Sequence, residues 1–149
     1  MKTLYQKIII ATDGTEYARK AINTAVSLSK LTDAKLYGVF VSDVSHITPT
    51  SVEWELVAEN IKREADMALA YVREKAAAEN LNFEAVNLSG SAAQEIVQYA
   101  NHINADLIVV GAAGKKAFER LLLGSVSEKI LRNAKQQVLV VKCTNLENE

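Results

Sequence analysis

Short runs of apolar residues, rich in β-branched side chains, alternate along the chain with amphipathic stretches. Runs of this kind are typical of strands that are covered on both faces. The amphipathic stretches place apolar residues at steps of three and four, which predicts helices with one inward face. The predicted strands are 8–11, 36–41, 83–88, 107–110 and 137–141, and the predicted helices contain 18–28, 52–79, 96–103 and 126–133.

This alternation predicts the α/β class, with an open, doubly wound, five-stranded parallel sheet and helices on both faces. The crossover connections of such folds are right-handed in nearly all cases. Ligands bind outside the carboxyl ends of the strands, where the strand order reverses. We therefore expect the informative residues directly after the first, second and fourth strands.

Length and charge narrow the class of protein. No linker, repeat or low-complexity tract divides the 149 residues, so we expect residues 1–149 to form one domain. The net charge of −1 provides no basic excess to neutralise a nucleic-acid backbone. No run approaches the roughly 20 apolar residues of a membrane span, and no signal peptide is recognisable. Cys143 is the only cysteine, which suits a reducing compartment, and we expect a cytoplasmic protein.

A glycine-rich segment follows the fourth predicted strand, with Gly111, Gly114, Gly124 and Ser125 as its markers. Glycine lets the backbone approach a ligand closely, and a phosphate needs N–H groups, a hydroxyl and a helix amino terminus. A structural interpretation is equally open, because Ser125 and Glu128 have the spacing of a capping box. The two roles are compatible, since a ligand can use the other free N–H groups of the first turn.

Asp13 stands directly after the first predicted strand. It can act as the N-cap of the following helix, with Glu16 three residues on, or it can accept hydrogen bonds from ribose hydroxyls. The turn that contains it, 12–14, is not the G-x-G-x-x-G of a dinucleotide fold, and no Walker string occurs in the chain. Neither familiar nucleotide loop is therefore present.

The spacing Gly111-x2-Gly114-x9-Gly124-Ser125 resembles the nucleotide-binding signature of the universal stress protein family. The resemblance extends to 8–16 as the opening strand and turn, to 105–111 as the fourth strand, and to 122–131 as the last helix. It implies a Rossmann-like sheet in the order 3-2-1-4-5. For members that carry this signature, it also implies ATP binding, with Mg²⁺ as a possible companion of the phosphates.

The resemblance also implies a role for individual residues. Asp13 matches the acidic residue near ribose and base, and Val41 matches the position whose backbone meets adenine. The first two glycines match the loop around ribose and phosphate, and 124–127 match the turn that holds the phosphates. The implied binding residues are Ala11, Thr12, Asp13, Val41, Gly111, Gly114, Gly124, Ser125, Val126 and Ser127.

Two positions depart from the family pattern. Ala112-Ala113 replaces the polar pair often found between the first two glycines, which removes possible side-chain contacts with a ligand. Gln137 stands where the family usually has proline, at the start of the last strand. Other polar residues suggest surface positions instead of a second site. Lys115, Lys116 and Arg120 suit solvated positions, and His46 and His102 have no partners at metal-ligand spacing.

Three hypotheses about function follow. The first is an ATP-binding regulatory protein of the stress response, which acts as a nucleotide-dependent sensor or switch on an unidentified downstream protein. The second is a slow Mg-dependent ATPase that uses the same pocket, although no base or arginine finger can be named by position, and no histidine partner makes Ser125 a nucleophile. The third is a dimerisation module without nucleotide binding. We also expect a homodimer through the apolar strand 137–141, which the implied order places at the sheet edge.

Overall fold

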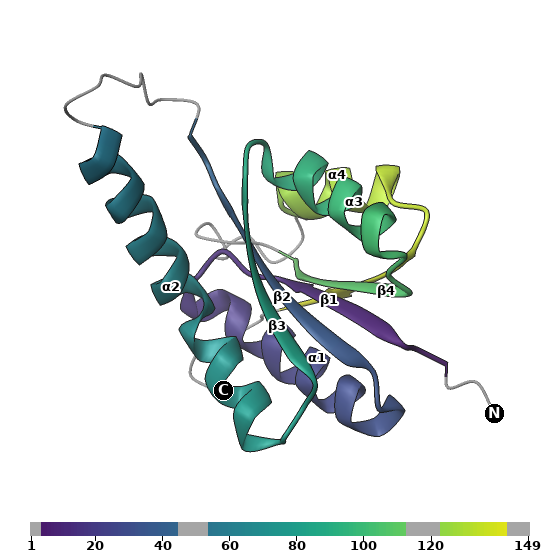
Figure 1. Ribbon diagram of the computed structural model, residues 1–149. Helices are drawn as coiled ribbons and strands as arrows, with labels where there is room; N and C mark the ends of the chain where they lie inside the picture. The colour runs from purple at the N-terminus through teal and green to yellow at the C-terminus, as the bar shows by residue number, and fades with distance from the viewer. Residues whose placement is uncertain (1–3, 45–53, 113–122, 143–149) are drawn as a thin grey trace.

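The computed structural model describes residues 4–44, 54–112 and 123–142 (Figure 1). Strands and helices alternate along the chain, as the hydrophobic pattern predicts. The strands are β1 (Lys7–Ala11), β2 (Lys35–Ser42), β3 (Phe83–Ser89), β4 (Leu107–Gly111) and β5 (Gln137–Val141). The helices are α1 (Arg19–Thr32), α2 (Trp54–Ala78), α3 (Ala92–Ile103) and α4 (Ser125–Asn133), and a 3-10 turn, η1 (Glu16–Ala18), precedes α1.

The strands form one parallel sheet in the order β3-β2-β1-β4-β5. This confirms both the predicted doubly wound sheet and the strand order that the family resemblance implies. β1 is the central strand and pairs with β2 on one side and with β4 on the other. The chain therefore leaves β1 first towards β2 and β3, and later returns to build β4 and β5 on the opposite side. The strand order reverses at β1, which is where such sheets bind ligands.

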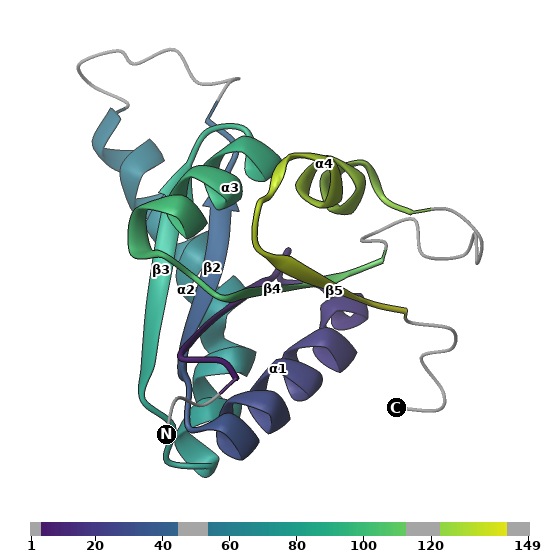
Figure 2. The same cartoon turned by 90° about the vertical axis from the view of Figure 1, so that its right-hand side faces the viewer.

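β1 is buried on both of its faces. Ile8, Ile9 and Ile10 each have 0% of their surface exposed. Because successive strand residues point to opposite faces, Ile8 and Ile10 pack in the core beneath α1 and α2, and Ile9 packs in the core beneath α3 and α4. Figure 2 shows α1 and α4 on opposite sides of the sheet. This double burial explains why the sequence of β1 has no polar alternation.

The long helix α2 is only partly packed against the sheet. The apolar residues that recur at steps of three and four along α2 begin at Trp54, but this stripe is buried only from Ala65 onward, and every residue in 54–64 is exposed or half-buried. A helix of 25 residues is about 37 Å long, whereas strands of five to eight residues span about 17–26 Å. The amino-terminal part of α2 therefore stands apart from the sheet (Figure 1). Across the described ranges, no helix combines the length and apolar character needed to cross a membrane.

The amino end of β1 is held by the residue that precedes β4. The Asp106 carboxylate accepts hydrogen bonds from the N–H groups of Gln6, at 2.8 Å, and Lys7, at 2.9 Å. The N–H of Asp106 in turn donates to the carbonyl of Lys7 at 2.9 Å. The Lys7 ammonium donates to the carbonyl of Ile103 at 2.8 Å. These bonds fix the register between β1 and β4.

We expect Asp106→Ala to lower the free energy of unfolding by about 1–3 kcal/mol, because it removes the charged acceptor of two backbone N–H groups. Urea denaturation followed by circular dichroism measures the change. Asp66→Ala is the matched control, because Asp66 is exposed on α2, and its effect should stay within about 0.5 kcal/mol. Equal stability of Asp106→Ala and Asp66→Ala would contradict this account of the register.

Candidate functional site

The carboxyl ends of β2, β1 and β4 lie side by side in that order at one edge of the sheet. The sequence-predicted residues fall at these ends: Val41 is the penultimate residue of β2, Asp13 follows β1, and Gly111 is the last residue of β4. The first turn of α4, with Ser125–Ser127, returns to the end of β4. Gly114 lies outside the described residues. The topology thus collects the other predicted positions on the edge where a ligand is expected.

The turn after β1 is organised by its own side chains. Asp13 Oδ1 accepts hydrogen bonds from the N–H of Thr15 at 2.9 Å and from its hydroxyl at 2.6 Å. The buried Thr12 hydroxyl oxygen accepts a hydrogen bond from the N–H of Gly14 at 3.1 Å. Asp13 is therefore an Asx-turn residue, and the predicted N-cap role is wrong: α1 begins only at Arg19, after η1, whose N-cap is Thr15. The second carboxylate oxygen, Oδ2, has no partner among the described residues and is available to a ligand.

Val41 presents free peptide groups beside this turn. The N–H of Thr12 donates to the carbonyl of Val39 at 3.0 Å, so the peptide groups of Val39 face β1. Peptide groups alternate between the two sides of a strand, so those of Val41 face the same side. β1 has ended by this level, because its last paired residue, Ala11, is opposite Val39. Within the described ranges, the N–H and C=O of Val41 consequently have no hydrogen-bond partner.

The two ends of the glycine-rich segment are joined at its base. The N–H of Gly124 donates to the carbonyl of Ala112 at 2.6 Å, and the N–H of Ala112 donates to the carbonyl of Val141 at 2.9 Å. The Ser127 hydroxyl donates to the carbonyl of Gly111 at 2.6 Å, and its side chain is buried. We call these three hydrogen bonds the base clamp. They hold the start of α4 against the ends of β4 and β5.

The start of α4 differs from the predicted capping box. Gly124, with φ −64° and ψ 156°, is the N-cap, Ser125 is already helical, and no side chain caps the first turn. Glu128 does not reach back but pairs with Arg132 at 2.8 Å. The capping-box interpretation is therefore wrong, because the extended Gly124 supplies the cap position itself. The N–H groups of Ser125–Ser127 have no partner within the helix, and Ser125 and Val126 are exposed, so this end of α4 can donate to an anion.

Metal chemistry has no ready-made ligand set in the described part of the chain. No group of three or more histidine, cysteine, aspartate or glutamate side chains lies together there. His102 is exposed on α3. The other polar residues named from the sequence lie outside the described residues, as does the only cysteine: His46, Lys115, Lys116, Arg120 and Cys143. The chemistry that the described site offers is hydrogen bonding from fixed donors and one carboxylate.

Comparison with known proteins identifies the family. The model of the universal stress protein family matches residues 4–142, nearly the whole chain. The chain belongs to the universal stress protein family. A curated relative, a universal stress protein of Methanocaldococcus jannaschii, is 41% identical over 143 residues, which cover 95% of this chain and 84% of the relative.

Solved universal stress proteins share the architecture. The one from Lactobacillus plantarum superposes with a TM-score of 0.77 at 25% identity, and the match covers 92% of this chain and 97% of that one. Another, solved in complex with cAMP, superposes with a TM-score of 0.68 at 25% identity, and the match covers 93% and 97% of the two chains. The family and the fold predicted from sequence are thereby confirmed.

The base clamp is the part of this universal stress protein site that was not predicted from the sequence. Ser127 was expected to face phosphates, but its hydroxyl is turned to the carbonyl of Gly111. Ala112 contributes through both of its peptide groups. Backbone donors and acceptors leave no trace in residue type, so only the glycine spacing hinted at them.

We expect Ser127→Ala to lower the free energy of unfolding by about 1–2 kcal/mol, because the partly buried carbonyl of Gly111 loses its donor. Thermal and urea denaturation provide the measurement. Ser125→Ala removes the same atom two residues earlier from an exposed side chain without a cap bond, and should change stability by less than about 0.5 kcal/mol. If both variants lose the same stability, the clamp does not depend on the Ser127 hydroxyl.

Proposed function

We propose that this universal stress protein binds ATP at the carboxyl edge of its sheet and acts as a nucleotide-dependent regulatory protein. The observation that carries the proposal is the order of three features across neighbouring strands. Free peptide groups at Val41 stand on β2, the Asp13 carboxylate follows β1, and the uncapped start of α4 adjoins β4. Base, sugar and phosphates follow one another in the same order along a nucleotide. Neighbouring strands are about 4.8 Å apart, so the three features cover a span of nucleotide size.

The base would be read by Val41. Its free N–H and C=O, on the side of β2 that β1 no longer covers, form a donor and acceptor pair. Adenine offers the complementary pair on its Watson–Crick edge, an N1 acceptor and an N6 donor. Guanine offers an N1 donor and an O6 acceptor, the reverse arrangement. The solved relative in complex with cAMP supports an adenine nucleotide as the ligand class.

The sugar and phosphates would follow along the same edge. Among the described residues, Oδ1 of Asp13 accepts from Thr15 and Oδ2 has no partner, so Oδ2 would accept a hydrogen bond from a ribose hydroxyl. The N–H groups of Ser125–Ser127 provide fixed donors for phosphate oxygens, and the base clamp holds them against β4. Backbone donors position phosphates without activating a water molecule, which favours a binding and signalling role, with Mg²⁺ as a counter-ion when present.

The regulatory proposal has a thermodynamic meaning. Occupancy of the site would stabilise one arrangement of the start of α4 by the difference in affinity between arrangements. A downstream protein that contacts this edge would then distinguish the bound from the free form. We propose the cytoplasm as the compartment, because ATP is available there.

We also propose a homodimer through β5. Among the described residues, β5 pairs with β4 alone, and 138–141 are half-buried apolar residues. An edge strand of this composition, with unpaired N–H and C=O groups, needs a cover. Pairing with β5 of a second copy across a two-fold axis would close both edges at once. Gln137, in place of the family's usual proline, keeps a backbone donor on this strand and accepts a hydrogen bond from the Tyr5 hydroxyl at 2.7 Å.

We expect ATP to bind at least about tenfold more tightly than GTP, because guanine would leave both peptide groups of Val41 mismatched. Isothermal titration calorimetry with ATP, GTP and inosine triphosphate measures the difference. Inosine triphosphate presents the same N1 donor and O6 acceptor as GTP and should bind as weakly. Equal affinities for ATP and GTP would remove the assignment of adenine to Val41.

We expect Val140→Lys to shift the protein from dimer to monomer, because it puts a charge on the edge strand proposed to pair. Sedimentation equilibrium at several concentrations gives the mass, and circular dichroism checks the fold. Val86→Lys is the matched control, because Val86 is a half-buried valine on β3, the opposite edge, and faces the same core. A wild-type monomer at high micromolar concentration, or a dimer unaffected by Val140→Lys, would exclude this interface.

A further inference from the structure

The turn that carries Asp13 rests directly on the long helix α2. Gly14 has φ +80°, and a Cβ atom at this position would lie 2.9 Å from Ala68 Cβ and 3.1 Å from Ala68 Cα. The first distance is shorter than a carbon–carbon contact allows, and the second is tighter than most such contacts. Gly14 therefore packs closely against Ala68, and residue 14 cannot carry a side chain without displacement of its surroundings.

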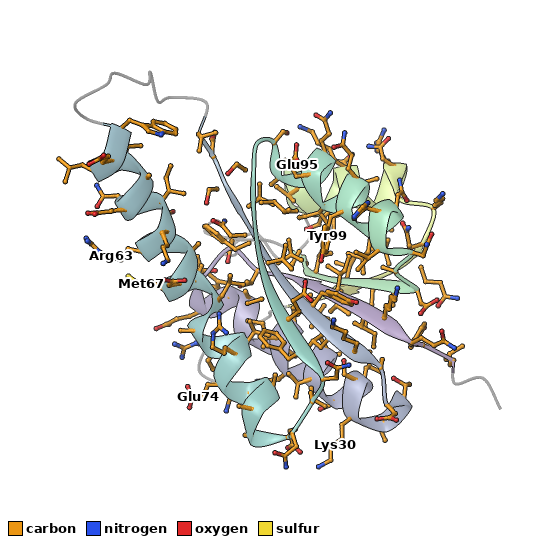
Figure 3. The ribbon with its side chains drawn as sticks, in the orientation of Figure 1. Lys30, Arg63, Met67, Glu74, Glu95 and Tyr99 are labelled. Atoms are coloured by element: carbon orange, nitrogen blue, oxygen red, sulfur yellow. The ribbon has the colours of Figure 1, made fainter. Side chains whose placement is uncertain are left out.

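Ala68 belongs to the well-packed part of α2. It lies on the buried stripe that continues through Val72 and Ala76, each with 0% exposure. Its neighbour Met67 points away from the sheet, with 73% of its surface exposed (Figure 3). Ala68 is held in place beside Gly14, because the buried stripe to which it belongs packs in the core between α1, α2 and the sheet.

A displacement of Gly14 would also move Asp13. The N–H of Gly14 is bonded to Thr12, and Asp13 Oδ1 is bonded twice to Thr15, so the four residues 12–15 form one hydrogen-bonded unit. Thr12 is itself bonded to β2 through its N–H. The position of the free Asp13 oxygen is thus set by β2 from one side and by Ala68 from the other.

We propose that Ala68 is a positioning residue of the nucleotide site: it sets the place of the Asp13 carboxylate through Gly14. This inference rests on the proposed function and deepens it. It makes α2, which supplies no predicted ligand contact, part of the framework of the site. The small size of residue 68 is then required by the ligand as well as by packing.

The first experiment needs no ligand. Ala68→Val and Ala76→Val add the same two carbon atoms to buried alanines on α2, but only Ala68 contacts Gly14. Nuclear magnetic resonance should show shifted Gly14 and Thr15 amide signals, with faster hydrogen exchange, in Ala68→Val alone. If Ala68→Val does not fold, Ala68→Gly provides the second variant. It removes the contact of the Ala68 side chain with Gly14 and should also speed exchange at Gly14. Unchanged Gly14 and Thr15 signals in the folded variant overturn the inference.

The second experiment distinguishes contacts to the sugar from contacts to the phosphates. Ala68→Val should lower the affinity for adenosine and for ATP by the same factor, about tenfold, because Asp13 is proposed to contact the ribose that both ligands contain. Gly124→Val should lower the affinity for ATP and leave the affinity for adenosine unchanged, because a branched side chain at the N-cap would obstruct only the phosphates. The φ of −64° at Gly124 allows a valine there. Ala76→Val should keep the wild-type affinity for both ligands, even if it is less stable.

The outcomes separate this inference from the proposed function. Wild-type protein that binds ATP, together with an Ala68→Val variant of equal affinity, overturns the positioning role alone. Wild-type protein that binds neither adenosine nor ATP overturns the proposed function and the nucleotide role of Ala68 with it. In that case, the Gly14 and Thr15 signals still decide whether Ala68 holds the turn.

Discussion

Burial of β1 on both faces is the constraint on which the rest of the molecule depends. Ile8, Ile9 and Ile10 have no exposed surface, so each face of the sheet requires a layer of helices. Burying one such side chain contributes roughly 1.5–3 kcal/mol, which makes this arrangement worth more than any local cap. Parallel strands need crossover connections, which here supply the helices on both faces, and parallel pairing brings every carboxyl end to the same edge. The location of the site is thus a consequence of how the core is packed.

The candidate site is made chiefly of backbone groups that the fold leaves over. Within the described residues, the peptide groups of Val41 have no hydrogen-bond partner because β2 extends beyond β1. The first N–H groups of α4 have no partner within the helix, and Gly124 caps it without a side chain. The helix dipole contributes only about 0.3–1 kcal/mol at an exposed end, whereas a hydrogen bond to a charged group contributes about 1.5–3 kcal/mol. Affinity for a phosphate would therefore come from the number of donors that converge, and from how firmly the base clamp holds them in place.

The sequence predicted what depends on long, repeated patterns and failed where two local choices differ little in energy. The five strands and their order followed from apolar runs and a family resemblance. A helix-cap role was one of two interpretations for Asp13 and for Ser125, but a cap is worth about 1 kcal/mol, and tertiary contacts easily override it. The apolar stripe of α2 did not indicate which part of the helix would be buried, because that depends on the length of the strands beneath it. The contact between Gly14 and Ala68 joins residues 54 positions apart, and no pattern in a single sequence reports such a pair.

The two departures from the family pattern acquire a physical meaning in this light. Ala112 takes part in the base clamp through its N–H and its C=O, so a polar side chain there is not needed to hold the segment. Gln137 is the first residue of β5, and its side chain accepts a hydrogen bond from the Tyr5 hydroxyl. Where the family usually has proline, this chain therefore has a hydrogen bond between the edge strand and the residues before β1. The carbonyl of Val141, at the other end of β5, accepts the clamp hydrogen bond from Ala112. The proposed phosphate site and the proposed dimer edge therefore share one strand, and pairing of β5 with a second copy would hold the strand end on which the clamp rests.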